Sequence, residues 1–295
     1  MRAASSLLAE AAAPAMAPPR RRGAWRRLLH NRLSALGLGL VAFFSVVAAA
    51  GPHLIPYSPV TQDLERTLQP PGAPHLLGTD EFGRDVLSRA VHGARLTLAI
   101  GLAVISASFL IGFLAGVGAA VHGGVTDEVI MRVMDVLLAL PGMLLAIVVV
   151  AALGPGTASL ILAMTVYNVP QFARMSRAAA LGVAHQSYIE AAGALGASPG
   201  RILFRHVVPN CLGPVLVFAM IRFSLTLLTA AGLSFLGLGI QPPTPEFGAM
   251  LHASRAYLWE APHLMLVYGG AVSLMVLGLN AMAEGFRDVL DPASG

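Results

Sequence analysis

The chain has 295 residues, of which 56% are hydrophobic and 12% charged, and its mean hydropathy is +0.72. Soluble domains carry roughly 25% charged residues, so this composition excludes an ordinary soluble protein and indicates a membrane protein. The net charge of +4 comes from arginines that lie mostly beside apolar segments, which is typical of a topology signal rather than of nucleic-acid binding.

The first 32 residues form an arginine-rich tail that we expect to be cytoplasmic and partly disordered, because residues 1–19 are rich in Ala and Pro. An apolar segment over 33–50 follows and predicts the first transmembrane helix. Its end, Ala48-Ala49-Ala50, also resembles the cleavage site of a signal peptide, and cleavage there would leave five spans. The run is long for a signal peptide, so a retained helix is favoured.

Five more apolar segments are each long enough for a membrane-spanning helix of about 20 residues. They run over 94–121, 130–153, 158–176, 210–236 and 263–283. Pro141 and Pro170 lie inside the second and third of these five, where we expect kinks rather than helix ends. The sequence therefore predicts an all-α polytopic membrane protein with six transmembrane helices, five of them in a core over 94–287.

Charges in the connecting segments predict the side of the membrane that each one occupies. The 177–206 loop carries Arg177, Arg201 and Arg205 against one acid, Glu190. The 51–93 and 237–262 segments instead contain more acidic residues than arginines. We therefore expect the 177–206 loop and both termini, including the C-terminus at 288–295, in the cytoplasm, and the other two segments outside.

The 51–93 segment is expected to carry an amphipathic helix on the outer membrane surface. Thr79, followed by two acidic residues, suits a helix N-terminus, where acids complement the helix dipole. Over 80–93, apolar residues recur at helical spacing, opposite a polar face that we expect to be solvated: Arg84, Asp85 and Arg89.

Several kinds of chemistry are excluded by what the sequence lacks. All 19 basic residues are arginine, which rules out a phosphate-binding loop with its lysine and any Schiff-base chemistry. The nine histidines show no metal-ligand spacing, and Cys211 is alone, so we expect neither metal site nor disulfide. No serine nucleophile pattern is present either. We expect no catalytic residue, cofactor or metal in this chain, so uphill transport would need a partner or an ion gradient.

The polar segment 188–209 predicts a helix–turn–helix between the fourth and fifth spans. Residues 188–195 are helix-compatible, and Gly196 suits the left-handed position after a helix end. Ser198 and Pro199 are typical of an N-cap and the first helical position, and the second helix is expected to end at Pro209. An amphipathic loop lying on the membrane is the alternative.

The spacing of this segment resembles the "EAA" loop of ABC-importer permeases. Glu190-Ala191-Ala192 is followed by three residues, Gly196 and nine more residues. His206 and Val208 stand where the general pattern has an apolar residue and leucine, although histidine is familiar in the peptide-importer branch.

Three further stretches resemble the C-type permease subunit of dipeptide, oligopeptide and nickel importers, in the order that the family uses. They are His75-Leu-Leu-Gly78-Thr79-Asp80-Glu-Phe-Gly83-Arg84-Asp85, Gly232-Leu-Ser234-Phe235-Leu-Gly237-Leu-Gly239-Ile-Gln241-Pro242-Pro243 and Gly285-Phe-Arg287-Asp288-Val-Leu-Asp291-Pro292. With the loop, they cover most of residues 30–292.

The resemblance implies the permease fold of a type I ABC importer in a bacterial inner membrane. It implies a second homologous permease, two ATP-binding subunits that hold ATP and magnesium, and a binding protein facing the 51–93 segment. The 188–209 loop would be the contact through which the ATPase moves the spans. The coupling residues expected there are Tyr188, Glu190, Ala191, Ala192, Gly196, Arg201, Arg205 and Pro209. Peptides are the expected substrate, with nickel or another small solute as the alternative.

Arg222 is an unusual residue for the fifth span, since it lies about ten residues in, roughly 15 Å deep. An ionisable residue there costs several kcal/mol and usually faces water or a partner. The resemblance implies a small residue at this position, so Arg222 is a departure. Our hypothesis is that it lines the pathway and favours an anionic group; snorkelling and an ion pair with the companion permease are alternatives. Tyr167 and Asn168 line the pathway or bond neighbouring helices.

Two other classes of membrane protein remain as rivals. A stand-alone ion-coupled transporter predicts inverted repeats and acids inside spans, and the sequence shows no clear sign of either. An intramembrane enzyme needs paired catalytic residues within helices, which we do not find.

Overall fold

The computed structural model describes residues 31–290, and within them the chain is helical with no β-strand beyond one isolated bridge between Thr79 and Asp85. The long helices are α3 (Arg32–Leu54), α4 (Val86–His122), α5 (Gly124–Ala139), α6 (Gly142–Leu153), α7 (Thr157–Ala184), α10 (Val208–Phe235) and α12 (Pro262–Leu290). Shorter ones are η2 (Leu64–Arg66), α8 (Ser187–Ala194), α9 (Pro199–Ile202), the π-helical turn η3 (Leu203–Val207), α11 (Phe247–Ser254) and η4 (Arg255–Tyr257). The all-α prediction is confirmed; the tail over 1–30 and the final Asp291-Pro292 lie outside the described residues.

Four helices are long and apolar enough to cross a membrane: α3, α4, the continuous Pro199–Phe235 segment and α12. The bent pair α5 and α6 makes a fifth if it is counted as one span. The predicted fourth span is present as the 28-residue helix α7, but polar residues such as Asn168 and Arg174 keep it out of this group. By length and apolarity, the described residues therefore give four or five spans rather than six.

Pro141 does not kink the predicted third span but separates two helices. Helix α5 ends at Ala139, Leu140 is extended, and α6 begins at Gly142 after a bend of 88°. A residue before proline is pushed out of the helical region by the pyrrolidine ring, which explains why the helix ends here. Pro170, in contrast, lies inside the continuous helix α7, as predicted.

The predicted amphipathic helix over 80–93 is wrong in its first half. Residues 80–85 form a turn, with Gly83 at φ +71°, and α4 begins only at Val86. Asp85 is the N-cap, because its carboxylate accepts a hydrogen bond from the Ser88 N–H at 2.6 Å. The side chains expected on a solvated face, Arg84, Asp85 and Arg89, are all buried.

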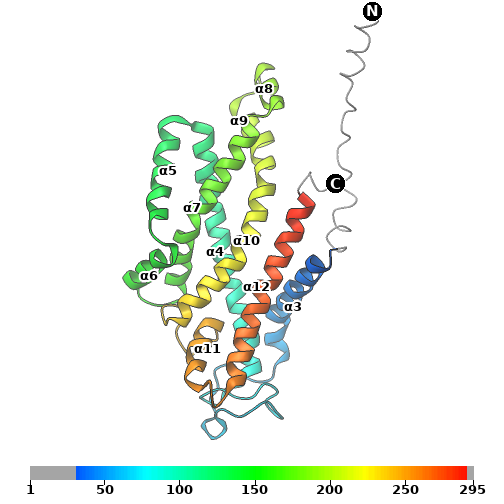
Figure 1. Cartoon of the computed structure of the whole chain (residues 1–295), viewed down its shortest axis with the longest axis vertical. Helices are drawn as coiled ribbons and strands as arrows, with labels where there is room; N and C mark the ends of the chain where they lie inside the picture. The colour runs from blue at the N-terminus through cyan, green and yellow to red at the C-terminus, as the bar shows by residue number, and fades with distance from the viewer. Residues whose placement is uncertain (1–30, 291–295) are drawn as a thin grey trace, which may run out of the picture.

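The core of the molecule is the long contact between α4 and α7. A Cβ atom at Gly112 would lie 2.4 Å from the Phe172 Cβ, and one at Gly116 would lie 2.2 Å from the Ala173 carbonyl oxygen. Such close approach of two backbones needs glycine, as is common in membrane helix pairs. Helix α10 packs on α7 and α12, and α12 packs on α3 (Figure 1).

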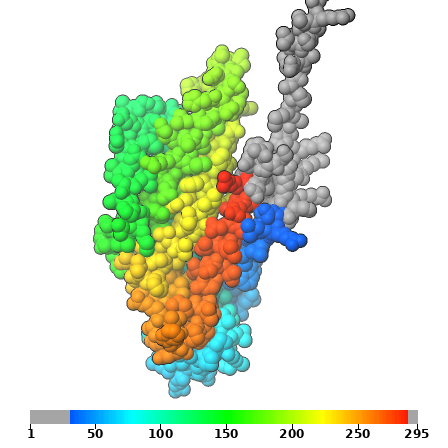
Figure 2. Space-filling view, viewed as in Figure 1, coloured from blue at the N-terminus to red at the C-terminus, as the bar shows by residue number. Residues whose placement is uncertain are grey.

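The functional segments lie at opposite ends of this elongated bundle. Helices α8 and α9 project at one end, beyond the ends of α3 and α12 (Figure 1). The 55–85 segment and α11 close the other end, where Figure 2 shows them as a continuous cap in cyan and orange. A loop and a cap so far apart can contact different partners.

Candidate functional site

The projecting loop is a helix–turn–helix with the caps that the sequence predicts. Gly196 adopts φ +84°, and the Ala197 N–H donates to the Ala192 carbonyl, which closes the end of α8. Ser198 is the N-cap of α9 and Pro199 its first residue. The predicted end of the first helix at Gly196 and start of the second at Ser198 and Pro199 are therefore confirmed.

The surface of this loop combines apolar and charged side chains. Leu195 is 89% exposed and Phe204 74% exposed, while Ile189 is buried and fixes α8 on the rest of the chain. Exposed large apolar residues in a loop that projects from the bundle mark a contact surface. The predicted coupling residues Tyr188, Glu190, Ala191, Gly196, Arg201, Arg205 and Pro209 are exposed, and Ala192 is half-buried.

Pro209 does not end the second helix of the loop. Residues 203–207 form a π-helical turn, in which the Val208 N–H donates to the Leu203 carbonyl, and α10 continues directly from it. Proline cannot donate a backbone hydrogen bond and crowds the carbonyl four residues earlier, so a wider turn before it removes the conflict. Helix α9, the π-helical turn and α10 form one continuous segment, which links the loop to a span without a break.

A small aromatic and amide cluster joins α8 to this segment. The Tyr188 ring lies 6.1 Å from the His206 ring, between centroids. The Asn210 amide donates to the His206 carbonyl at 2.6 Å and to the Tyr188 hydroxyl at 3.4 Å. Helix α8 is thus bonded to the π-helical turn and the start of α10, as well as connected to them through the turn at Gly196 and α9.

The three predicted pathway residues meet inside the bundle. Arg222 of α10 is 7% exposed, and its Nε and Nη2 donate to the Asn168 Oδ1 at 3.1 and 2.6 Å. Its guanidinium also lies over the Tyr167 ring, 5.2 Å from the centroid. Sequence reasoning found all three residues as polar positions within spans, but not that they form one group.

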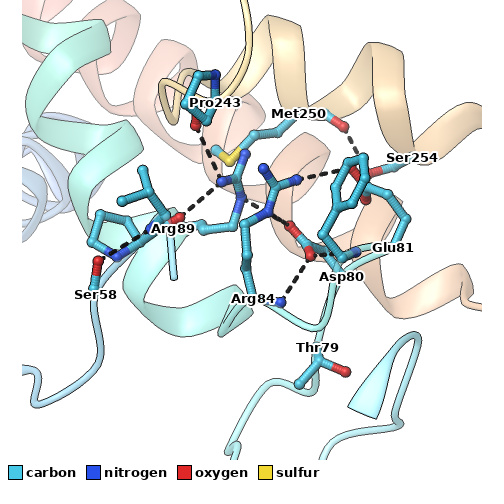
Figure 3. Close-up of polar contacts among 12 residues, drawn as sticks. Ser58, Thr79, Asp80, Glu81, Arg84, Arg89, Pro243, Met250 and Ser254 are labelled. Carbon is cyan, nitrogen blue, oxygen red and sulfur yellow. Dashed lines mark hydrogen bonds and ion pairs between the residues drawn. The ribbon is translucent and has the colours of Figure 1, made fainter. Parts of the chain in front are cut away.

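A second polar cluster, in the cap at the other end, was missed by the sequence analysis. Asp80 receives two arginines, whose side chains lie next to each other (Figure 3): Arg84 Nε donates to its Oδ2 at 2.7 Å, and Arg89 Nε lies 3.1 Å from the same oxygen. Arg84 also donates to Glu81 Oε1 at 2.9 Å. All but the partly exposed Glu81 are buried, so Asp80 holds two desolvated cations. The Gly-Thr-Asp and Gly-Arg-Asp tripeptides were the only sequence signal of this cluster.

The Asp80 cluster joins the start of α4 to two segments that are distant in the sequence. Arg89 Nη1 donates to the carbonyls of Pro59 at 2.9 Å and Pro243 at 3.4 Å, so α4 is bonded to the segments that follow α3 and α10 (Figure 3). Ser88 donates to the Tyr57 carbonyl at 2.7 Å. Burial, followed by the charge of Asp80, raises the pKa of the Glu81 carboxyl above its ordinary value.

Glu246 fixes the short helix α11 in the cap. Its carboxylate accepts hydrogen bonds from the backbone N–H groups of Gly248 at 2.9 Å and Ala249 at 3.0 Å. The side chain is 2% exposed, and this burial raises the pKa of the Glu246 carboxyl above its usual 4.5. Glu246 is an N-cap enclosed by the protein, and the sequence analysis counted it only as a loop charge.

Comparison with known proteins matches two parts of the chain to transport families. Residues 93–294 match the family described as binding-protein-dependent transport system inner membrane component. Residues 20–71 match the N-terminal TM domain of oligopeptide transport permease C.

Curated relatives match over most of their length. The dipeptide transport system permease protein DppC of Alkalihalophilus pseudofirmus is 40% identical over 271 residues, which cover 92% of this chain and 89% of the relative. The di/tripeptide transport system permease protein DppC of Pseudomonas aeruginosa is 41% identical, covering 91% and 90%. The glutathione transport system permease protein GsiD of Pectobacterium atrosepticum is 40% identical, covering 91% and 89%.

The fold is also found among solved transporters. One chain of the inward-facing MetNI methionine ABC transporter superposes with a TM-score of 0.56 at 22% identity, covering 69% of this chain and 97% of that one. Identity at this level shows the fold alone, whereas the family match and the curated relatives show descent. The chain therefore belongs to the binding-protein-dependent transport system inner membrane components, and it is a multi-pass permease subunit of an ABC transporter.

Proposed function

We propose that this permease subunit carries di- or oligopeptides across the inner membrane of a bacterium, in a pathway that it forms with a second, homologous permease. Two ATP-binding subunits and a substrate-binding protein outside the membrane complete the importer. The dipeptide, di/tripeptide and glutathione permeases among its relatives support a peptide substrate. The observation that carries the proposal is the exposed helix–turn–helix of α8 and α9, which continues without a break into α10.

We further propose six spans with both termini in the cytoplasm. The additional span is α7, in which Asn168 is buried among the contacts with α4, α6 and α10, and the exposed Arg174 pairs with Asp135 of α5 at 2.6 Å. Polar residues are tolerated in a span when they face other helices or a water-filled path rather than lipid. The 51–93 segment and α11 then lie outside, and the α8–α9 loop lies inside, as the arginine distribution favours.

In the proposed mechanism, the ATPase pair closes on ATP and displaces the α8–α9 loop. The slim surface at Ala191 and Ala192 admits close contact, and Leu195 supplies an apolar anchor. Arg201 and Arg205 are free to meet acidic groups of the ATPase. Because α9, the π-helical turn and α10 are continuous, displacement of the loop moves α10 as a rigid element. This chain would hold no nucleotide, metal or catalytic group itself.

Tyr167, Asn168 and Arg222 are the proposed lining of the pathway within this subunit. A hollow of about 390 Å³ lies beside α10 at Phe218 and Ile221, one helical turn or less before Arg222, although none of the three residues is in its wall. A nickel permease of the same family is the second candidate for the substrate. A stand-alone ion-coupled transporter is disfavoured by the family match and the projecting loop.

The test is a pull-down of the intact importer in mild detergent, comparing the native chain with a Glu190→Ala/Gly196→Asp variant. We expect the variant to lose the ATP-binding subunit while keeping the second permease, since Gly196 needs a positive φ and Glu190 is exposed on α8. Glu65→Ala, an exposed acid in the cap at the other end, is the control. Retention of the ATPase by the loop variant would refute its role as the handle.

A further inference from the structure

The buried charge of Arg222 is the feature from which a substrate class can be inferred. Three arginines of the described part are buried: Arg84, Arg89 and Arg222. The first two share the Asp80 carboxylate, whereas none of the ion pairs among the side chains of residues 31–287 includes Arg222. Its hydrogen-bond partner is the neutral amide of Asn168, which accepts N–H groups but does not neutralise a charge.

The guanidinium is held in a fixed place. The Asn168 amide donates through Nδ2 to the Met164 carbonyl at 2.8 Å and to the Thr226 hydroxyl at 3.3 Å, so its oxygen must face Arg222. The Tyr167 ring that lies beneath the guanidinium fills the space where α6 begins, since a Cβ at Gly142 would lie 1.9 Å from that ring. Helices α6, α7 and α10 together fix the position of one cation.

Part of the guanidinium remains available for another group. It carries five N–H groups, of which Asn168 takes two. The remaining N–H groups match a carboxylate, which arginine binds through two parallel hydrogen bonds. The nearby hollow beside α10 is otherwise apolar, with Arg287 as its one charged wall residue among Gly213, Pro214 and Ile221. Arg222 is not in the wall of this hollow but follows Phe218 by one helical turn, so a solute whose carboxylate bound Arg222 would have apolar surface within one turn of α10.

We propose that Arg222 binds the carboxylate of the transported peptide during its passage, and that Asn168 and Tyr167 are positioning residues for this contact. The inference rests on the proposed peptide transport and adds the group that the pathway recognises. The same chemistry could come from an acidic side chain of the companion permease, and only a substrate carboxylate makes transport depend on the charge of the peptide.

The experiment is uptake by the whole importer in proteoliposomes, with alanine dipeptide and tripeptide as probes beside their C-terminal amides. For each importer we take the ratio of acid uptake to amide uptake. The same binding protein is used throughout, so its own preference for acid or amide cancels when the ratio of a variant is divided by that of the native importer. We expect Arg222→Gln to lower this ratio on the order of tenfold, through slower uptake of the acids alone, and Arg222→Lys to retain most of it.

A second variant tests the same contact without removing the arginine. Asn168→Asp places a carboxylate of the same shape against the guanidinium, at the loss of the hydrogen bond that the amide donates to the Met164 carbonyl. Because the aspartate neutralises Arg222, it should lower the acid-to-amide ratio as Arg222→Gln does. Arg174→Gln, in which the lost arginine already has a partner in Asp135 at 2.6 Å, is the control and should leave the ratio unchanged.

The outcomes separate the inference from the proposed function. Equal changes in acid and amide uptake, or native ratios in both Arg222→Gln and Asn168→Asp, would overturn the carboxylate contact and favour an ion pair with the companion permease. If the native importer takes up none of these peptides, with or without the terminal carboxylate, the proposed substrate class itself fails.

Discussion

At the scale of single residues, buried charges lie in two places, around Asp80 in the cap and at Arg222 inside the bundle. Asp80 neutralises Arg84 and Arg89 in the cap, and it also accepts the backbone N–H groups of Phe82 at 3.0 Å and Arg84 at 2.9 Å. Removing one member of a buried ion pair leaves the other charge without compensation, which costs much more than losing an exposed pair. The cap should therefore depend on Asp80 more than on any exposed acid around it.

The change Asp80→Asn tests this dependence. We expect it to lower the free energy of unfolding by about 3–5 kcal/mol, because two buried guanidinium groups lose their counter-charge. Asp63→Asn is the matched control, since its pair with Arg66 is about half exposed and should contribute less than about 1 kcal/mol. Thermal or denaturant unfolding of the detergent-purified subunit measures both. Equal losses would show that the Asp80 cluster does not hold the cap.

The Asp80 cluster also shows where sequence reasoning stops. Helical spacing placed Arg84 and Arg89 on a solvated face, because periodicity distinguishes polar from apolar positions but cannot show that a carboxylate folds back over them. Gly196 and Ser198, in contrast, were predicted correctly, since a left-handed turn and an N-cap are decided by residues a few positions apart.

At the scale of elements, Pro141 and Pro170 were both predicted to kink a helix, but only one of them lies inside a continuous helix. Pro141 is followed by Gly142, a turn-forming dipeptide, and α5 ends there with a bend of 88°. Pro170 and Pro214 lie inside continuous helices, and Pro209 follows a π-helical turn. The break between α5 and α6 could have been predicted from the Pro-Gly pair. The π-helical turn could not, because no residue type in it marks such a turn.

Helix α11 depends on a buried acid, which makes the stability of the cap pH-dependent. Burial raises the pKa of Glu246 in the folded state above its ordinary 4.5. At a pH between the ordinary pKa and the raised one, the folded chain therefore binds more protons than the unfolded chain. The free energy of unfolding therefore rises as pH falls through this window and is flat above it. We expect the Tm of the native subunit to rise relative to the Tm of Glu246→Gln as the pH is lowered towards 4.5.

The control for this prediction is Glu65→Gln, an exposed acid in the same cap. Its melting profile should run parallel to the native one across the same pH range, because its side chain is exposed rather than enclosed in the cap. A Glu246→Gln profile that is also parallel to the native one would mean that the carboxylate is solvated in the folded protein.

At the scale of the whole molecule, the open question is whether α7 crosses the membrane. Composition predicted six apolar segments, but length and apolarity of the described helices give four or five. The difference lies in Asn168, Gln171 and Arg174, which lower the apolarity of α7, and in the bend that divides the preceding span. Both features are expected of helices that face a polar pathway, because their neighbours rather than lipid satisfy the polar groups.

Cysteine labelling decides the number of spans, because the chain has a single cysteine, the buried Cys211. In a Cys211→Ala background, single cysteines replace exposed residues on either side of α7 and beyond α10: Pro155, Leu195 (89% exposed) and Trp259 (94% exposed). With six spans, a membrane-impermeant maleimide should label Pro155→Cys and Trp259→Cys in intact cells, and Leu195→Cys only after permeabilisation. If α7 does not cross, Pro155→Cys and Leu195→Cys share one side and label together. Labelling after denaturation controls for cysteines that a partner covers, so masking by the ATPase or the binding protein cannot imitate a membrane barrier.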